Sequence, residues 1–261
     1  MVPCLDLNSL PVPLASMAGR ILVAVAIVVG HFLLIAKARK MGLDTSIASI
    51  FSACLIGGGL LFGHWFKFLY WPATWPQLAE KPLVLLNVSF GQASLGGIVG
   101  GLLCGWALLR WKAPADHRMR YLDALALVFP YPWMLGRLHC VLVHDHPGIR
   151  TTHWLGVRYP DGTRFDLGLL ELLFLCAIAI ALHTLRRKSP PAGALCGLFL
   201  LTYGIFRLLL DTLHVDPVRH LGLTVDQWGA GVAILAGALL LVPILRAQVL
   251  ALCASPRLSE N

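Results

Sequence analysis

Long apolar runs, separated by short polar stretches, dominate the chain. Seven of these runs are long enough to cross about 30 Å of hydrocarbon as a helix. They lie near residues 18–36, 46–70, 91–110, 121–143, 167–185, 192–213 and 226–245. The pattern predicts an all-α polytopic membrane protein, a bundle of about seven transmembrane helices. Residues 1–261 then form a single transmembrane domain with no separate soluble part.

The longest polar stretch covers residues 144–166 and joins the fourth run to the fifth. We expect it to form an external loop. Within the fourth run, Pro130 and Pro132 are expected to bend the helix, because proline lacks the amide hydrogen that a helix interior uses. The bend precedes a charged residue, which indicates the wall of a cavity.

Basic residues orient the bundle. Loops rich in Lys and Arg alternate with loops that hold few, and the positive-inside rule places the richer set in the cytoplasm. The amino terminus and residues 144–166 are therefore expected outside, and the carboxy terminus inside. The richer set is Lys37, Arg39, Lys40, Arg110, Lys112, Arg118, Arg120, Arg186, Arg187, Lys188, Arg246 and Arg257.

Composition agrees with a membrane protein, because 57% of the residues are hydrophobic and 13% are charged, against about a quarter charged in soluble domains. The formal net charge of +8 reflects cytoplasmic flanks that face anionic lipid, so no nucleic-acid partner is expected. The seven cysteines include no Cys-x-x-Cys pair. Their spacing predicts neither a zinc site nor a disulfide framework, and we expect no cofactor.

Arg20 and Lys67 lie in the first and second runs, and two further arginines lie inside apolar runs, Arg137 in the fourth and Arg207 in the sixth. A charge in hydrocarbon costs about 2.5–3.5 kcal/mol even on the mildest scale, so such an arginine indicates a functional site. Each lies roughly 10 Å from the outer end of its run at about 1.5 Å per residue. The matching depths predict a shared anionic ligand, and in a bilayer this is a lipid phosphate.

Polar residues in the sixth run recur at helical spacing. Tyr203, Arg207 and Asp211 are four residues apart and share one helix face, with His214 three residues further on. In one interpretation Arg207 binds an anion and Asp211 holds it in position. In the other, an Arg–Asp pair joins two helices. Glu171 lies one turn inside the fifth run on the same side and offers an acid or a base.

The cluster His144-Asp145-His146 follows the fourth run. These residues could ligate a metal together with another histidine, or they could be polar surface residues at a helix end. Gly96 and Gly97 lie near the outer end of the third run. They could let two helices approach closely or expose backbone to a ligand.

These features, in this order, resemble the prolipoprotein diacylglyceryl transferases of bacteria. Gly136-Arg137, with Asp145 and Gly148, resembles the family signature Gly-Arg-x-Gly-Asn-Phe-x-Asn-x-Glu-x-x-Gly. The other three similar segments are Arg164 to Glu171, Tyr203-Gly204-x-x-Arg207 with Asp211, and Gly222-Leu223-Thr224-x-x-Gln227. The resemblance runs from roughly residue 17 to residue 245.

The resemblance implies a multi-pass protein of the bacterial plasma membrane. Its activity would move diacylglycerol from phosphatidylglycerol to the lipobox cysteine thiol of a prolipoprotein signal peptide, and we expect it to act as a monomer. Arginines are well suited to bind the phosphate of the lipid. A base must remove the proton of the lipobox cysteine, because the thiolate is the nucleophile. The residues expected to bind phosphate and lipid are Arg137, Arg207, Tyr203, Asp211, Gly96, Gly97 and Arg164. The candidate acids and bases are His144, His146, Asp145 and Glu171.

The chain departs from the family pattern at several positions. Leu95 stands where the family has the histidine of His-Gly-Gly, and leucine cannot accept a proton. His144 and His146 are the expected substitutes, because neutral imidazole acts as a base near neutral pH. The other departures are Ala18 for tyrosine, His64 for the arginine of Gly-x-Arg, and Cys140 and Val143 for asparagines.

Two other functions fit the same residues. The arginines could form the pocket of a non-catalytic binder or transporter of anionic lipid. Alternatively, His144-Asp145-His146 could serve a metal-dependent membrane enzyme. Turnover of bound lipid separates the first from a transferase, and sensitivity to a chelator identifies the second.

Overall fold

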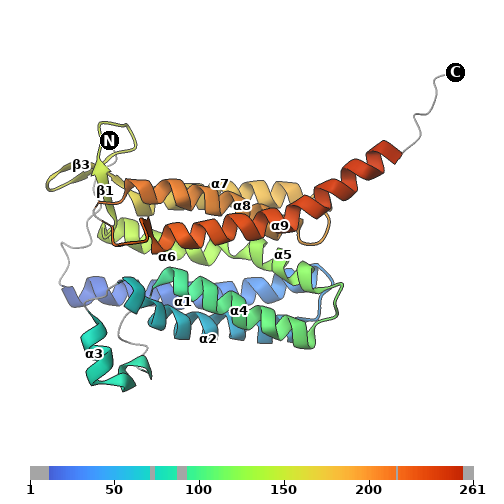
Figure 1. Cartoon of the computed structure of the whole chain (residues 1–261), viewed down its shortest axis with the longest axis horizontal. Coiled ribbons are helices and arrows are strands. Elements are labelled where there is room, and N and C mark those ends of the chain that lie inside the picture. Colours follow the sequence, from blue (N-terminus) through green and yellow to red (C-terminus); the bar gives the residue numbers. More distant parts are fainter. Residues whose placement is uncertain (1–11, 71–73, 87–92, 216, 255–261) are drawn as a thin grey trace.

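The computed structural model describes residues 12–70, 74–86, 93–215 and 217–254. Its long helices run side by side along the longest axis of the molecule (Figure 1). They are α1 (Val12–Lys40), α2 (Thr45–Tyr70), α4 (Ser94–Lys112), α5 (Arg118–Val128), α6 (Pro130–Val143), α7 (Leu167–Arg186), α8 (Ala194–Leu210) and α9 (Val225–Ala254). The short helical segments are α3 (Trp75–Glu80), η3 (Pro82–Leu86) and η5 (Asp211–Leu213).

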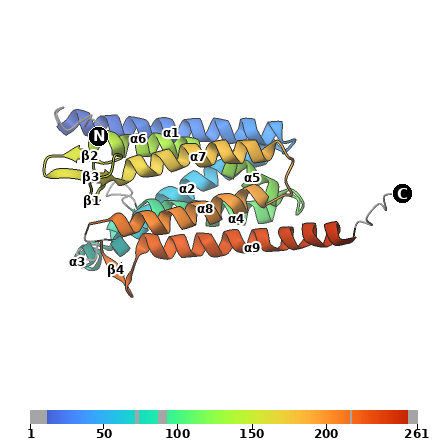
Figure 2. The same ribbon diagram turned by 90° about the horizontal axis from the view of Figure 1, so that it is seen from above.

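Seven segments among the described residues are long and apolar enough to cross a membrane. They confirm the seven predicted runs, with ends that differ by several residues. Residues 91 and 92, which the prediction included in the third run, lie outside the described residues. Helix α9 continues well past residue 245, and Figures 1 and 2 show it extending beyond its neighbours toward the carboxy terminus.

The fourth membrane span consists of two helices. Helix α5 ends at Val128 and α6 begins at Pro130, so Phe129 lies at the junction. Proline at the first position of a helix costs nothing, because that amide has no partner inside the helix. The helix boundary therefore falls at the predicted prolines, about two turns before Arg137, while Phe129 keeps helical dihedral angles (φ −53°, ψ −38°) and the bend stays a prediction.

Glycines bring α2 and α4 into close contact. A Cβ atom at Gly100 would lie 2.2 Å from Cβ of Phe62 and 2.5 Å from the carbonyl oxygen of Gly58. A Cβ atom at Gly96 would lie 2.4 Å from Cβ of Phe66. Small residues allow such approach of two backbones in lipid. One face of α4 is therefore held against α2, and another face lines an internal cavity.

The expected external loop contains a small sheet, which the apolar pattern did not predict. Strands β1 (Pro147–Arg150), β2 (Val157–Tyr159) and β3 (Gly162–Asp166) form an antiparallel sheet in the order β1-β3-β2. A hairpin of β4 (Arg219–His220) and β5 (Leu223–Thr224) precedes α9. The three-stranded sheet and α3 lie at the same end of the bundle (Figure 1).

Candidate active site

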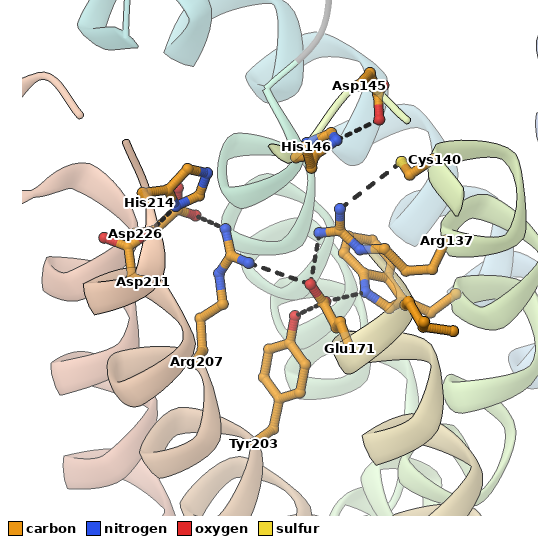
Figure 3. Close-up of polar contacts among 12 residues, drawn as sticks. Arg137, Cys140, Asp145, His146, Glu171, Tyr203, Arg207, Asp211, His214 and Asp226 are labelled. Atoms are coloured by element: carbon orange, nitrogen blue, oxygen red, sulfur yellow. Dashed lines mark hydrogen bonds and ion pairs between the residues drawn. The ribbon is translucent and has the colours of Figure 1, made fainter. Parts of the chain in front are cut away.

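A buried carboxylate joins three helices of the bundle. Glu171 of α7 is 1% exposed at its side chain. Its Oε1 accepts hydrogen bonds from Nε1 of Trp133 and the hydroxyl of Tyr203, both at 2.7 Å. Its Oε2 lies 3.0 Å from Nη2 of Arg137 and 3.1 Å from Nη1 of Arg207 (Figure 3). Arg137 and Arg207 therefore meet on one carboxylate.

Local structure places these groups. Asp166 caps α7, because its Oδ1 accepts a hydrogen bond from the amide of Leu169 at 2.9 Å. The cap sets the start of the helix, so Glu171 points inward just beyond the first turn. On α8, Tyr203 and Arg207 are one turn apart and face the same carboxylate.

Arg207 has a second carboxylate partner. Its Nη2 lies 3.1 Å from Oδ1 of Asp226, in the first turn of α9. The side chain of Asp226 is 15% exposed, so it is more accessible than Glu171. Sequence reasoning missed Asp226, although a carboxylate at the start of an apolar run was a usable signal. The two positive charges of the arginines are thus balanced by the carboxylates of Glu171 and Asp226.

Asp211 contacts other residues than predicted. It accepts a hydrogen bond from the hydroxyl of Thr224 and one from Nδ1 of His214 at 3.0 Å. The expected contact between Asp211 and Arg207 is wrong, because Glu171 and Asp226 take that place. Asp211 instead joins the end of α8 to the hairpin before α9.

A cavity of about 370 Å³ opens beside the two arginines. Arg137, Tyr203, Arg207 and Asp226 line its charged end. Apolar side chains line the rest, including Leu55, Trp106, Leu125, Phe199 and Leu240. A charged end and a long apolar body suit an amphiphile with an anionic group, because each part meets an environment of matching polarity.

Leu95 and the two glycines that follow it have different neighbours. Leu95 and Gly97 line the cavity. Gly96 faces α2, where a Cβ atom would clash with Phe66. The side chain of Leu95 covers α9, since a Cβ atom at Gly229 would lie 2.4 Å from its Cδ1. Of this pair of glycines, Gly97 can contact a ligand in the cavity directly.

The two histidines of the predicted cluster have different partners. His144 places Nδ1 2.9 Å from Oδ2 of Asp166, which also accepts a hydrogen bond from Tyr159 at 3.0 Å. Its Nε2 is buried with no hydrogen-bond partner among the described residues. His144 therefore belongs to the junction of α6 and α7. The convergence of His144, Asp145 and His146 expected for a metal site does not occur.

His146 instead lies with Asp145 and Cys140. Nδ1 of His146 contacts Oδ1 of Asp145, and the possible donor atoms of these three residues lie within 4.8 Å of one another. Thiolate, imidazole and carboxylate are zinc ligands, so this set could hold a metal. Sγ of Cys140 also lies 3.9 Å from Nη1 of Arg137 (Figure 3), and that positive charge opposes a cation at the same place.

The contact between His146 and Asp145 holds a positive charge on His146, beside Cys140. Hydrogen bonds to Asp145 and Cys140 raise the pKa of His146 from 6.5 to about 9. Burial acts to raise the pKa of Asp145, but the hydrogen bonds from His146 and Cys140, together with the charges of His146 and His139, outweigh it, so the pKa of Asp145 is lowered. His146 is therefore protonated at neutral pH, and in that form it has no lone pair for a proton.

Arg164 lies on β3, in the three-stranded sheet. Its guanidinium group contacts both carboxylate oxygens of Asp161, and its Nη1 donates to the carbonyl oxygen of Gly148 at 3.0 Å. Arg164 is not among the described residues that line the cavity. An isolated bridge between Gly148 and His214 ties this sheet to the end of α8.

The sequence is similar to those of known proteins. The pattern of the prolipoprotein diacylglyceryl transferase family matches residues 4–243. The phosphatidylglycerol–prolipoprotein diacylglyceryl transferase of Chlorobaculum tepidum is 28% identical over 207 residues, which are 74% of this chain and 71% of that protein. Proteins of the same name from Pectobacterium carotovorum and Photobacterium profundum are 27% and 30% identical, over 76% and 65% of this chain and 76% and 66% of their own length. The chain therefore belongs to the prolipoprotein diacylglyceryl transferase family.

Proposed function

We propose that the protein transfers diacylglycerol from phosphatidylglycerol to the lipobox cysteine thiol of prolipoproteins. One observation carries the proposal: Arg137 and Arg207 converge at the charged end of an apolar cavity. The related proteins carry the same activity in their names. We further propose that the protein acts as a monomer in the bacterial plasma membrane, with its amino terminus outside.

The arginines would bind the phosphate of the lipid, and the acyl chains would lie along the apolar part of the cavity. Guanidinium groups form short, charge-assisted bonds to phosphate oxygens. As the ester bond breaks, negative charge grows on the departing glycerol phosphate, and fixed positive groups stabilise it in a site that excludes water. Tyr203 and Gly97 border the same space.

Glu171 suits a positioning role better than that of a base. Its two oxygens already accept from Trp133, Tyr203, Arg137 and Arg207. These four contacts leave little room for a further proton donor. They also hold both guanidinium groups against the same carboxylate oxygen. We propose that Glu171 orients the arginines. Asp211 would order the hairpin before α9, and Arg164 would order the external sheet.

Complementation tests the proposal in cells. A bacterial strain depleted of its own transferase should grow and lipidate its prolipoproteins when it expresses this chain. In vitro, the purified protein with phosphatidylglycerol should add a diacylglyceryl group to a lipobox peptide, which mass spectrometry detects. A peptide with serine in place of the lipobox cysteine is the control. Tight lipid binding without any transfer would contradict the proposal and favour a lipid-binding protein.

A further inference from the structure

Transfer to a thiol needs a group that removes the thiol proton, because the thiolate is the nucleophile. Most candidates in this site already have partners. Glu171 accepts four contacts, Asp145 is paired with protonated His146, and His144 is bonded to Asp166. Leu95, which lines the cavity, cannot accept a proton.

Asp226 differs from these groups in its position. Among the described residues that line the cavity, it is the acidic one. It lies in the first turn of α9, three residues before Gly229. The side chain of Leu95 packs against Gly229. Among the described residues, its one ion pair is to Nη2 of Arg207 at 3.1 Å, at the place expected to bind phosphate (Figure 3). The carboxylate is thus next to the atoms that would react.

A lipid phosphate would compete with Asp226. Arg207 is shared between Glu171 and Asp226, and a phosphodiester brings one further negative charge to the same guanidinium group. Like charges at such distances repel strongly where water is scarce. Glu171 is 1% exposed and held by four donors, whereas Asp226 is 15% exposed and borders the cavity. Asp226 is therefore the partner that can move aside.

We propose that Asp226 is an exchangeable partner of Arg207 that becomes the general base once the lipid phosphate takes its place. Once Asp226 has left the guanidinium group, its carboxylate oxygens are free to accept the thiol proton. The base would then be released only when the lipid is bound. This inference rests on the proposed transferase function.

In the transfer step, the thiol sulfur forms a bond to the glyceryl carbon that bears the phosphate ester. The bond between that carbon and the phosphate oxygen breaks, and its electron pair leaves on glycerol phosphate. The thiol proton passes to a carboxylate oxygen of Asp226 and from there to glycerol phosphate or water. Asp226 returns to Arg207 when glycerol phosphate has left.

The test compares Asp226→Asn and Asp226→Glu with the full-length wild-type protein. Asp116→Asn, an exposed carboxylate far from the cavity, is the matched control. With a lipobox peptide, Asp226→Asn should lower kcat about 10²-fold, a typical contribution of a general base. The KM for phosphatidylglycerol should not rise, because Arg207 loses a competitor. Asp226→Glu should restore part of kcat, and Asp116→Asn should behave as wild type.

A selenocysteine lipobox peptide separates a base from a structural residue. A selenol is largely ionised at neutral pH and needs no base, so Asp226→Asn should transfer to it at a rate close to wild type. Equal losses with thiol and selenol, a wild-type kcat in Asp226→Asn, or a raised KM would each overturn the inference. Absence of transfer by the wild-type protein itself would instead overturn the proposed function.

Discussion

At the scale of residues, the site depends on one buried carboxylate between two guanidinium groups. Removal of one partner from a buried ion pair leaves an uncompensated charge and costs about 3–5 kcal/mol. Glu171 has two such partners, Arg137 and Arg207, at 3.0 Å and 3.1 Å. Each arginine is therefore expected to stabilise the bundle in addition to its proposed role in phosphate binding, and an experiment has to separate the two.

Arg137→Ala and Arg207→Ala should each abolish phosphatidylglycerol-dependent transfer while protein remains in the membrane. Lysine should recover little, because a point charge replaces a planar fork. Transfer assays measure activity, immunoblots of membranes measure the amount of protein, and thermal unfolding in detergent measures stability. Arg150→Ala, on an exposed side chain of the external sheet, is the control. Normal transfer in either alanine variant would refute a shared phosphate site.

The pair of His146 and Asp145 predicts a dependence of stability on pH. The folded protein raises the pKa of His146 from 6.5 to about 9, so its bound proton stabilises the fold fully below pH 6.5. That contribution is lost as pH rises from 6.5 through about 9. The difference in melting temperature between wild type and His146→Gln should shrink over this interval. Parallel melting curves across the interval would contradict the assigned pair.

The choice of His144 and His146 as bases stays a prediction, which a double substitution tests. If they act as bases, replacing both with glutamine lowers kcat by about 10²-fold or more. Because His146 holds its proton and His144 is bonded to Asp166, we expect a smaller loss than in Asp226→Asn. Steady-state kinetics with the lipobox peptide at neutral pH compares the two variants. A larger loss in the double variant would return the role of base to the histidines.

At the scale of elements, close packing of α2 and α4 shapes one wall of the cavity. Gly96 and Gly100 face α2, Leu95 lines the cavity, and Gly97 borders both the cavity and Gly59 of α2. A shift of α4 away from α2 would therefore narrow the space next to the arginines. The glycines act on the site through the distance between two helices.

Gly100→Ala should lower both stability and transfer, because its Cβ atom would lie 2.2 Å from Phe62. Forcing a group into a filled interface costs about 1–3 kcal/mol. Gly57→Ala, on α2 with nothing within 4 Å of the added atom, is the matched control. It should leave the melting temperature unchanged or raise it, since alanine favours a helix over glycine. Equal melting temperatures in both variants would contradict the packing argument.

At the scale of the whole molecule, the distribution of basic residues predicts the orientation in the membrane. The sheet, the arginine pair and the charged end of the cavity then face the outer leaflet. A lipid phosphate at that level can enter without crossing the bilayer, and an exported prolipoprotein presents its lipobox on the same side. The orientation therefore decides which leaflet supplies the lipid.

Cysteine labelling tests the orientation. In a background without reactive native thiols, an impermeant maleimide applied to intact spheroplasts should modify Thr152→Cys and leave Ala115→Cys unmodified. Both positions are exposed in the structure, so access to reagent depends on the side of the membrane. Labelling after lysis controls for reactivity. The reverse pattern would overturn the orientation and the choice of leaflet.

The sequence alone determined the seven membrane spans, and it singled out Pro130, where a helix begins, and Arg137 and Arg207, which meet on one carboxylate. Each of these depends on a local property. A run of apolar residues has to match the thickness of the bilayer, proline removes an amide hydrogen wherever it occurs, and a charge inside such a run is costly regardless of its neighbours. The family motifs are also read from adjacent residues. None of these inferences requires knowledge of which helices are in contact.

Only the tertiary structure decided which charged groups meet. The helical spacing paired Arg207 with Asp211, but α7 and α9 bring Glu171 and Asp226 to it instead. His144 contacts Asp166 of β3, 22 residues further along the chain, whereas His146 contacts its sequence neighbour Asp145. The short strands of residues 147–166 gain stability from pairing with one another and carry little periodic signal of their own. Contacts between segments distant in sequence depend on helix packing, and that packing is set by the fold of the whole bundle.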